Sequence, residues 1–132
     1  MSTPALDILV VDDDRPLMEV VEIALSGYGH HVRTATDGHA ALESVERAWP
    51  DLLLLDLMLP ECDGFEVASR VRARQPAGRR LPIILLTGLD ARAYQGLALS
   101  YGVDDYLVKP FRLDELLSKV ETWGRPSNAT AG

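Results

Sequence analysis

The sequence predicts an α/β fold in which helices cover both faces of a five-stranded parallel sheet. Short apolar runs alternate with segments of helical periodicity five times along the chain. Several of the apolar runs are continuous and do not alternate with polar residues, which is typical of strands buried on both faces. The chain has 132 residues, of which 47% are hydrophobic and 25% charged, a composition that suits one folded domain with a sizeable core.

Five short segments are the predicted strands. The first, third and fourth each contain four consecutive aliphatic residues, and strands of this length are common in such sheets. In chain order, the predicted strands are Asp7–Val11, His31–Thr34, Leu52–Leu55, Pro82–Leu86 and Asp105–Val108.

Apolar residues at helical spacing predict a helix after each strand. Such spacing places one apolar stripe against the sheet. The stripe of the first helix consists of Leu17, Val20, Val21, Ala24 and Leu25. Gly96 lies inside the fourth helix, where glycine costs about 1 kcal/mol relative to alanine. The four later helices are predicted at Gly38–Ala48, Gly64–Arg74, Ala91–Ser100 and Leu113–Val120, the last with an apolar face of Leu113, Leu116, Leu117 and Val120.

The composition excludes several classes of protein. The longest apolar run, around Leu52 to Leu59, is interrupted by Asp56 and is too short to span a membrane, and no secretory signal pattern begins the chain. Cys62 is the only cysteine, so an internal disulfide is excluded, in agreement with a reducing compartment. We therefore expect a cytoplasmic domain without membrane association.

The charge distribution argues against a nucleic-acid-binding protein. The formal net charge is -7, and five arginines lie in one eleven-residue stretch without an acid, leaving eight basic residues against 20 acidic ones elsewhere. A solvated helix face and loop explains this stretch better than a docking patch for an acidic partner. The arginines are Arg70, Arg72, Arg74, Arg79 and Arg80.

A change in composition marks the end of the predicted domain. Residues 124–132 consist mainly of Gly, Pro, Ser, Asn, Thr and Ala and have no apolar periodicity. We therefore expect one domain over residues 1–123 and a disordered tail or truncated linker over residues 124–132.

Polar residues stand at the carboxyl ends of four predicted strands, where ligands collect in open α/β sheets. Grouped carboxylates repel one another and raise their pKa values unless a cation compensates, and oxygen ligands select a hard ion such as Mg²⁺. With a hydroxyl and an ammonium group, such a site has donors for phosphoryl oxygens and a carboxylate able to act as the acceptor. These residues are Asp12, Asp13 and Asp14 after the first strand, Asp56 after the third, Thr87 after the fourth and Lys109 after the fifth.

The aspartates differ in how strongly they indicate a site. Asp56 directly follows four leucines, a poor place for a charge without a function. Asp12 and Asp13 could be cap or turn residues, but an acidic pair after a buried strand favours the site. Asp14 precedes Arg15–Pro16 and is better explained as a helix cap.

The remaining polar candidates are weaker. Thr87 and Lys109 are each ordinary alone, and only their shared edge with Asp56 makes them site candidates. Cys62, His30 and His31 have no matching ligands in the sequence, so a structural or exposed role is expected for them.

Four stretches of the sequence carry a family resemblance. They are Ile8–Asp14 (ILVVDDD), Leu54–Pro60 (LLDLMLP) with Asp63-Gly64-Phe65, Leu85–Gly88 (LLTG) and Asp104–Phe111 (DDYLVKPF). In this order and at these spacings they resemble the receiver domains of two-component response regulators. The resemblance covers residues 6–121 and implies a doubly wound, flavodoxin-like fold with five helices and strand order 2-1-3-4-5.

The resemblance also implies roles for the site residues. Asp56 would be the phosphoacceptor, receiving its phosphoryl group from a phosphohistidine on a sensor histidine kinase or phosphotransfer protein. Thr87 and Lys109 would contact the phosphoryl oxygens. The Mg²⁺ ligands would be Asp13, Asp56 and the backbone carbonyl of Met58, with Asp12 acting through water.

A switch is implied as well. Thr87 would move toward the site and Tyr106 would turn inward, altering the face formed by the fourth helix, fifth strand and fifth helix and so controlling an output partner or domain. Gly88 stands where the family usually has alanine, and the Lys109-Pro110 peptide bond is expected to be cis. No enzymatic activity beyond the domain's own phosphorylation and dephosphorylation is expected.

The resemblance leaves homodimerisation open. Regulators that dimerise through this face carry paired charges, and the chain keeps part of that set in Asp104, Asp105, Glu115 and Lys119. It has Gln95 and Ser100 on the fourth helix where further charges would be expected.

Two positions are predicted to tune dephosphorylation. They lie two residues beyond Asp56 and two beyond Thr87, and are occupied by Met58 and Leu89. Family members that dephosphorylate quickly tend to have an amide and an acid there, which orient the attacking water, so a persistent phosphoryl group is expected here.

Two other classes compete with this interpretation. A haloacid-dehalogenase-like phosphatase also uses a strand-end aspartate and Mg²⁺, but it needs a second aspartate at the position of Met58. A flavodoxin-like binding module would need a hydroxyl-rich phosphate loop after the first strand, and the acidic Asp12–Asp14 stands there instead.

Overall fold

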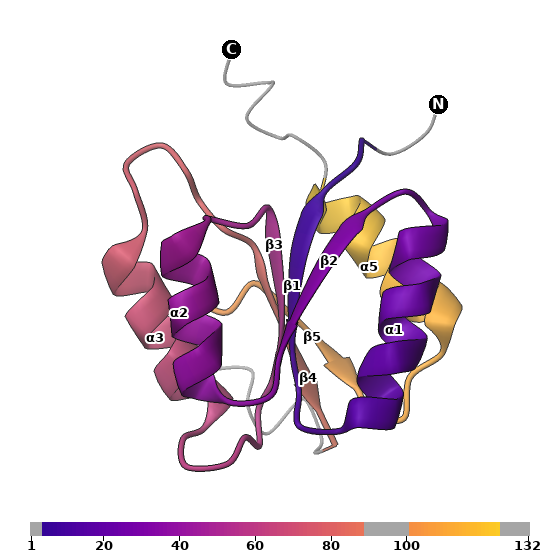
Figure 1. Cartoon of the computed structure of the whole chain (residues 1–132), viewed down its shortest axis with the longest axis horizontal. Helices are drawn as coiled ribbons and strands as arrows, with labels where there is room; N and C mark the ends of the chain where they lie inside the picture. The colour runs from indigo at the N-terminus through magenta and orange to yellow at the C-terminus, as the bar shows by residue number, and fades with distance from the viewer. Residues whose placement is uncertain (1–3, 89–100, 125–132) are drawn as a thin grey trace.

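Five parallel strands form one central sheet in the computed structural model, which describes residues 4–88 and 101–124 (Figure 1). The spatial order of the strands is β2-β1-β3-β4-β5, so the predicted fold class and strand order are confirmed. The strands are β1 (Asp7–Val11), β2 (His31–Ala35), β3 (Leu52–Asp56), β4 (Ile83–Thr87) and β5 (Asp105–Val108).

Four helices within the described ranges cover the two faces of the sheet. Helices α1 and α5 lie on one face, and α2 and α3 lie on the other (Figure 1). The helix predicted at Ala91–Ser100 lies outside the described residues. The bounds are Arg15–Gly27 for α1, Gly38–Arg47 for α2, Gly64–Arg74 for α3 and Leu113–Gly124 for α5.

The core has two halves because successive strand residues point to opposite faces. In β3, Leu53 and Leu55 pack toward α2 and α3, whereas Leu52 and Leu54 pack toward α1 and α5. All four side chains are fully buried, and full burial of one leucine contributes about 1.5–3 kcal/mol. The continuous apolar run is therefore explained by a strand with no solvent face.

Aspartates begin three of the helices. Each accepts a hydrogen bond from a backbone N–H in the first turn, which would otherwise have no helical partner. The prediction that Asp14 is a cap is therefore confirmed. The three contacts are Leu17 N to Asp14 Oδ1 (3.0 Å), Ala40 N to Asp37 Oδ1 (2.7 Å) and Glu66 N to Asp63 Oδ1 (2.8 Å).

The largest boundary error is at the end of α5. The apolar stripe predicts that this helix ends at Val120, but it continues to Gly124, which was assigned to the tail. Trp123 packs against the core on this face, and a β-carbon at Gly124 would lie 2.3 Å from Leu6 Cδ1. Contacts with distant segments therefore stabilise the last turn of α5, and the apolar periodicity of the helix itself does not indicate this turn.

The arginine stretch is mostly paired within the chain. Arg70 pairs with Glu66, Arg74 with Glu46, and Arg80 with Asp104. These pairs reduce the charge available for a docking patch, in line with the solvated face that we favoured over such a patch.

Arg72 is the exception, because its side chain is only 19% exposed. Its guanidinium donates to Leu81 O (2.6 Å), Gly102 O (2.7 Å) and Asp104 Oδ2 (2.9 Å). The expectation of a solvated face is therefore wrong at this position. Arg72 instead joins α3 to the segments that precede β4 and β5.

No helix within residues 4–88 and 101–124 has the length and hydropathy that a membrane crossing requires.

Loss of Arg72 should destabilise the domain strongly. Arg72→Ala removes the donor of two backbone carbonyls, Leu81 O and Gly102 O, and one of the partners of the Asp104 carboxylate, which keeps Arg80 and the N–H of Ile83. The free energy of unfolding should therefore fall by about 2–4 kcal/mol. Arg79→Ala is the matched control, because this exposed arginine should contribute less than about 0.5 kcal/mol. Urea unfolding of both variants measures the difference, and equal effects would contradict the structural role of Arg72.

Candidate functional site

The predicted site residues gather at the carboxyl edge of the sheet. Asp12 directly follows β1, Asp56 ends β3, Thr87 ends β4 and Lys109 directly follows β5. The parallel register brings these positions together, because Asp56 lies opposite Leu86 and Thr87 lies opposite Val108. One edge therefore carries acidic, hydroxyl and ammonium groups that are far apart in sequence.

Three carboxylates form a close cluster. Asp12, Asp13 and Asp56 each contribute an oxygen, and these three oxygens lie within 4.8 Å of one another. Asp12 is 1% exposed and Asp56 5% exposed, whereas Asp13 is exposed. The predicted acidic cluster is present, and it forms an acidic trio of the kind that holds hard divalent cations.

Lys109 supplies the nearest positive charge. Its Nζ lies 2.7 Å from Asp12 Oδ2 and 3.5 Å from Asp56 Oδ1. Its backbone N–H donates to the carbonyl of Thr87 (2.7 Å), and the Lys109-Pro110 peptide bond is cis, as the resemblance predicts. One ammonium group contacts two of the three carboxylates, so the site keeps an excess of negative charge.

This crowding shifts the pKa of the acceptor candidate. Burial, followed by the charge of Asp12, raises the pKa of Asp56 from 3.8 to about 6, although Lys109 and the backbone N–H of Met58 partly oppose the rise. Burial lowers the pKa of Lys109, but the hydrogen bond and charge of Asp12 and the charge of Asp56 outweigh it, so that pKa is raised. Ionised Asp56 is therefore destabilised until more positive charge arrives.

The tight loop between β3 and α3 fixes the position of Asp56. The N–H of Met58 donates to Asp56 Oδ1 (3.3 Å), and the N–H of Gly64 donates to the carbonyl of Leu57 (2.7 Å). A β-carbon at Gly64 would lie 2.6 Å from the carbonyl oxygen of Asp56 and 2.9 Å from Leu57 Cα. Only glycine permits this approach. In the sequence, Gly64 belongs to one of the stretches that carry the resemblance but has no predicted role, and the Asp-Gly pair at the start of a helix is the signal that could indicate one.

The other site candidates surround the trio. The Thr87 side chain is buried, and Tyr106 is half-buried against the core cluster that packs on α2 and α3. Gly88 is exposed, and a β-carbon there would meet no atom within 4 Å, so the usual alanine would also fit. The Met58 side chain is 67% exposed at the rim. Leu89 lies outside the described residues.

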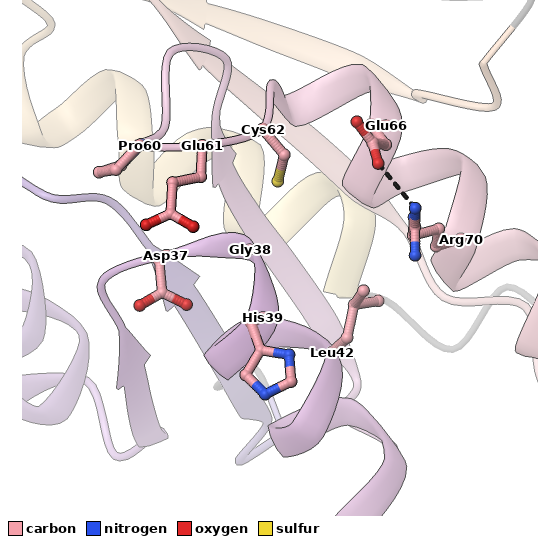
Figure 2. Close-up of a pocket in the computed structure, with 9 residues that line it drawn as sticks. All are labelled: Asp37, Gly38, His39, Leu42, Pro60, Glu61, Cys62, Glu66 and Arg70. Carbon is pink, nitrogen blue, oxygen red and sulfur yellow. Dashed lines mark hydrogen bonds and ion pairs between the residues drawn. The ribbon is translucent and has the colours of Figure 1, made fainter.

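His30, His31 and Cys62 are not members of the acidic trio. His30 is buried, and its Nδ1 accepts the N–H of Leu6 (3.1 Å), while burial lowers its pKa. His31 is exposed. Cys62 is a free thiol that lines a pocket of about 420 Å³ between the beginnings of α2 and α3 (Figure 2). His30 is thus a structural residue and His31 is exposed, as expected, whereas Cys62 is half-buried and its expected role stays a prediction.

The sequence profile of the response regulator receiver domain family matches residues 8–121. The chain belongs to this family. A receiver domain is not a conventional enzyme.

Named relatives agree with this family. The response regulator MprA of Mycobacterium leprae is 46% identical over 113 residues, which are 86% of this chain and 48% of that protein. MprA of Mycobacterium ulcerans is 45% identical over the same share of this chain and 47% of that protein. The receiver chain thus spans about half the length of the curated relatives it matches.

Solved structures also resemble the receiver domain. A two-component response regulator from Clostridium difficile superposes with a TM-score of 0.85 at 27% identity, covering 92% of this chain and 98% of that one. The CheY-like receiver domain protein from Methanospirillum hungatei gives a TM-score of 0.86 at 26% identity, covering 98% of this chain and all of the other.

Removing the charge of Asp56 should stabilise the metal-free receiver domain. The folded state binds the Asp56 proton more tightly than the unfolded chain, so stability falls as pH rises from about 4 to about 6. At pH 7 the ionised carboxylate then costs up to about 3 kcal/mol. Asp56→Asn should therefore raise the free energy of unfolding at pH 7 in EDTA, and this gain should vanish near pH 4.

Urea unfolding across this pH range measures the effect. Asp114→Asn is the control, because Asp114 is fully exposed and pairs with Arg112 outside the trio. A gain that grew toward low pH would contradict the assignment of the raised pKa to Asp56.

Proposed function

We propose that Asp56 accepts a phosphoryl group from a phosphohistidine on a sensor histidine kinase or phosphotransfer protein, in a reaction that requires Mg²⁺. The observation that carries the proposal is the burial of the Asp56 carboxylate against Asp12, within 3.5 Å of the Lys109 ammonium. Asp56 is a buried carboxylate with a raised pKa, one cation nearby and the exposed acid Asp13 beside it. Such an arrangement lowers the stability of the fold and is typical of a reactive group.

The donor set suits Mg²⁺. Every available ligand is an oxygen, and the excess negative charge of the trio needs compensation. Asp13, Asp56 and the backbone carbonyl of Met58 would hold the ion. Both oxygens of Asp12 already accept hydrogen bonds, Oδ1 from the N–H of Asp14 (2.9 Å) and Oδ2 from Lys109 (2.7 Å), which favours an indirect role through water.

The transfer is an in-line displacement at phosphorus. An oxygen of Asp56 forms a bond to phosphorus while the phosphorus–nitrogen bond of the phosphohistidine breaks, and the electron pair of that bond returns to the imidazole ring. With a pKa of about 6, Asp56 is mostly ionised at neutral pH and so able to attack. Bound Mg²⁺ supplies positive charge that compensates the oxygens of the phosphoryl group.

Lys109 and Thr87 complete the acceptor site. The ammonium of Lys109 would donate a hydrogen bond to a phosphoryl oxygen. Its contact with Asp12 would weaken as this new contact forms. The hydroxyl of Thr87, at the end of the neighbouring strand, would donate to another oxygen. Gly88 leaves open space beside it, so access for the phosphoryl group is unobstructed by a side chain at that position.

Phosphorylation would then alter the output face. A shift of Thr87 toward the site would allow Tyr106 to turn inward, changing the surface of the predicted fourth helix, β5 and α5 and so the affinity for an output protein or domain. A phosphorylation-dependent homodimer through this face remains one form of output. We place the domain in the cytoplasm, and we assign residues 1–123 to the receiver domain together with Gly124, where α5 ends, and the residues after it to a tail or linker.

Phosphorylation by a small donor tests the proposed acceptor. With acetyl phosphate and Mg²⁺, the protein should gain the mass of one phosphoryl group, because Asp56 attacks the donor directly. Asp56→Asn should abolish this gain, and Asp13→Ala should reduce it by at least about tenfold through loss of a metal ligand. Asp114→Asn is the control for a change of charge alone.

Two outcomes would reject this function. A mass gain that persists in Asp56→Asn would place the acceptor elsewhere. Steady turnover of a phosphate ester by the native protein would instead indicate the phosphatase class, which the exposed thioether of Met58 disfavours because that class needs a carboxylate at this position.

The phosphoryl group should persist on the native domain. Neither the thioether of Met58 nor the isobutyl group of Leu89 orients an attacking water, so loss of about 1–2 kcal/mol of barrier lowering should slow hydrolysis about five- to thirtyfold. The double variant Met58→Asn with Leu89→Glu should restore fast decay of phospho-Asp56, measured by mass spectrometry over time. Met58→Leu with Leu89→Ile controls for substitution alone, and equal or slower decay in the polar variant would contradict the prediction.

A further inference from the structure

A second polar cluster, built around one carboxylate, ties β5 to α5 at the other end of the sheet. Asp105 begins β5, and its carboxylate accepts hydrogen bonds from Tyr106 N (2.8 Å), Lys119 Nζ (3.0 and 3.1 Å) and Trp123 Nε1 (2.8 Å). Lys119 and Trp123 are one turn apart on α5, so one side chain holds two successive turns of the helix. We call Asp105, Lys119 and Trp123 the β5–α5 clamp.

The clamp holds the end of α5, beyond its last fully buried residue. Val120 is the last fully buried residue of α5, and Glu121 and Thr122 are exposed. Trp123 packs against the core and donates to Asp105, and Gly124 lies close to Leu6, so both residues connect the last turn to the rest of the domain. A hydrogen bond to a carboxylate is among the stronger side-chain contacts, so Asp105 has a large share in fixing this turn.

Strand β5 spans the distance between the clamp and the proposed phosphorylation site. Asp105 is its first residue, and Lys109, which contacts Asp12 and Asp56, directly follows its last. The N–H of Tyr106, the proposed switch residue, donates to the clamp itself. A displacement of β5 along its length at Lys109 or Tyr106 therefore reaches Asp105 within the same strand.

We propose that the β5–α5 clamp makes β5 and the last turn of α5 move as one unit, so that phosphorylation of Asp56 changes the surroundings of Trp123 at the opposite end of the domain. The proposal rests on the function proposed above and adds to it the route by which the signal leaves the site. Asp105 and Lys119 form an ion pair within one chain, so each charge is compensated before any partner binds. They are positioning residues, because neither contacts the reacting atoms.

Fluorescence of Trp123 provides the test. The chain has two tryptophans, so Trp49→Phe leaves Trp123 as the single reporter. In this background, acetyl phosphate with Mg²⁺ should change the emission of Trp123 while mass spectrometry records the phosphoryl group on Asp56. Asp105→Ala should remove most of this emission change without lowering the phosphorylated fraction. Asp114→Ala, which removes an exposed carboxylate of the same helix, should leave the change intact.

The readouts separate the two proposals. No mass gain in the native background would overturn the proposed function and this inference with it. A mass gain with no emission change, or with the same change in Asp105→Ala, would overturn the inference alone.

A second measurement does not depend on the folding of Asp105→Ala. In the native chain, beryllofluoride with Mg²⁺ as the phosphoryl mimic should change amide hydrogen exchange across Glu121–Gly124. In Trp123→Phe, which keeps an aromatic ring but lacks the N–H donor, basal exchange there should be about fivefold faster. Unchanged exchange of the native last turn on adding the mimic would reject the coupling.

Discussion

Parallel pairing of the strands is the constraint on which the acidic site depends. Because β1, β3, β4 and β5 all run in one direction, the residues at their carboxyl ends lie at the same edge of the sheet. Three carboxylates then meet within 4.8 Å, a spacing that no local segment of the chain would favour. The fully buried leucines of β3 provide the hydrophobic stabilisation that keeps Asp56 at this position despite the repulsion.

Lys109 sets the balance of charge at this edge. Its Nζ lies 2.7 Å from a carboxylate oxygen of Asp12 but 3.5 Å from one of Asp56. Of these two buried carboxylates, Asp56 is therefore the less compensated by positive charge, and it is the one proposed to accept a phosphoryl group. The pKa of about 6 at Asp56 follows from the same arrangement. A site with stronger pairing would be more stable but less able to accept positive charge and a new anion.

The sequence predicted the strands and the acidic trio because each depends on local pattern or on the parallel edge. The strand order came from the family resemblance and not from local pattern. The errors occur where distant residues decide. The solvation expected of Arg72 fails because Leu81, Gly102 and Asp104 surround it, and the end of α5 is fixed by partners in β5 and at Leu6.

Gly64 was missed for a related reason. Its role depends on the distance between the beginning of α3 and the backbone of Asp56, a close approach that becomes visible only once the loop is closed. The predicted carboxyl ends of the third and fourth strands are also one residue too early. Asp56 and Thr87 still pair within the sheet, whereas the sequence places each of them directly after its strand.

The aspartate caps have an electrostatic consequence for the acidic edge. Helices α1 and α3 begin directly after the segments that carry Asp12, Asp13 and Asp56, so the positive ends of their macrodipoles lie on the side of the sheet where the trio is found. Asp14 and Asp63 each offset part of that positive potential with a full negative charge. Helix ends that are free to bind anions in other folds therefore attract them less strongly here, and attraction of an incoming anion depends mainly on Lys109 and on a bound cation.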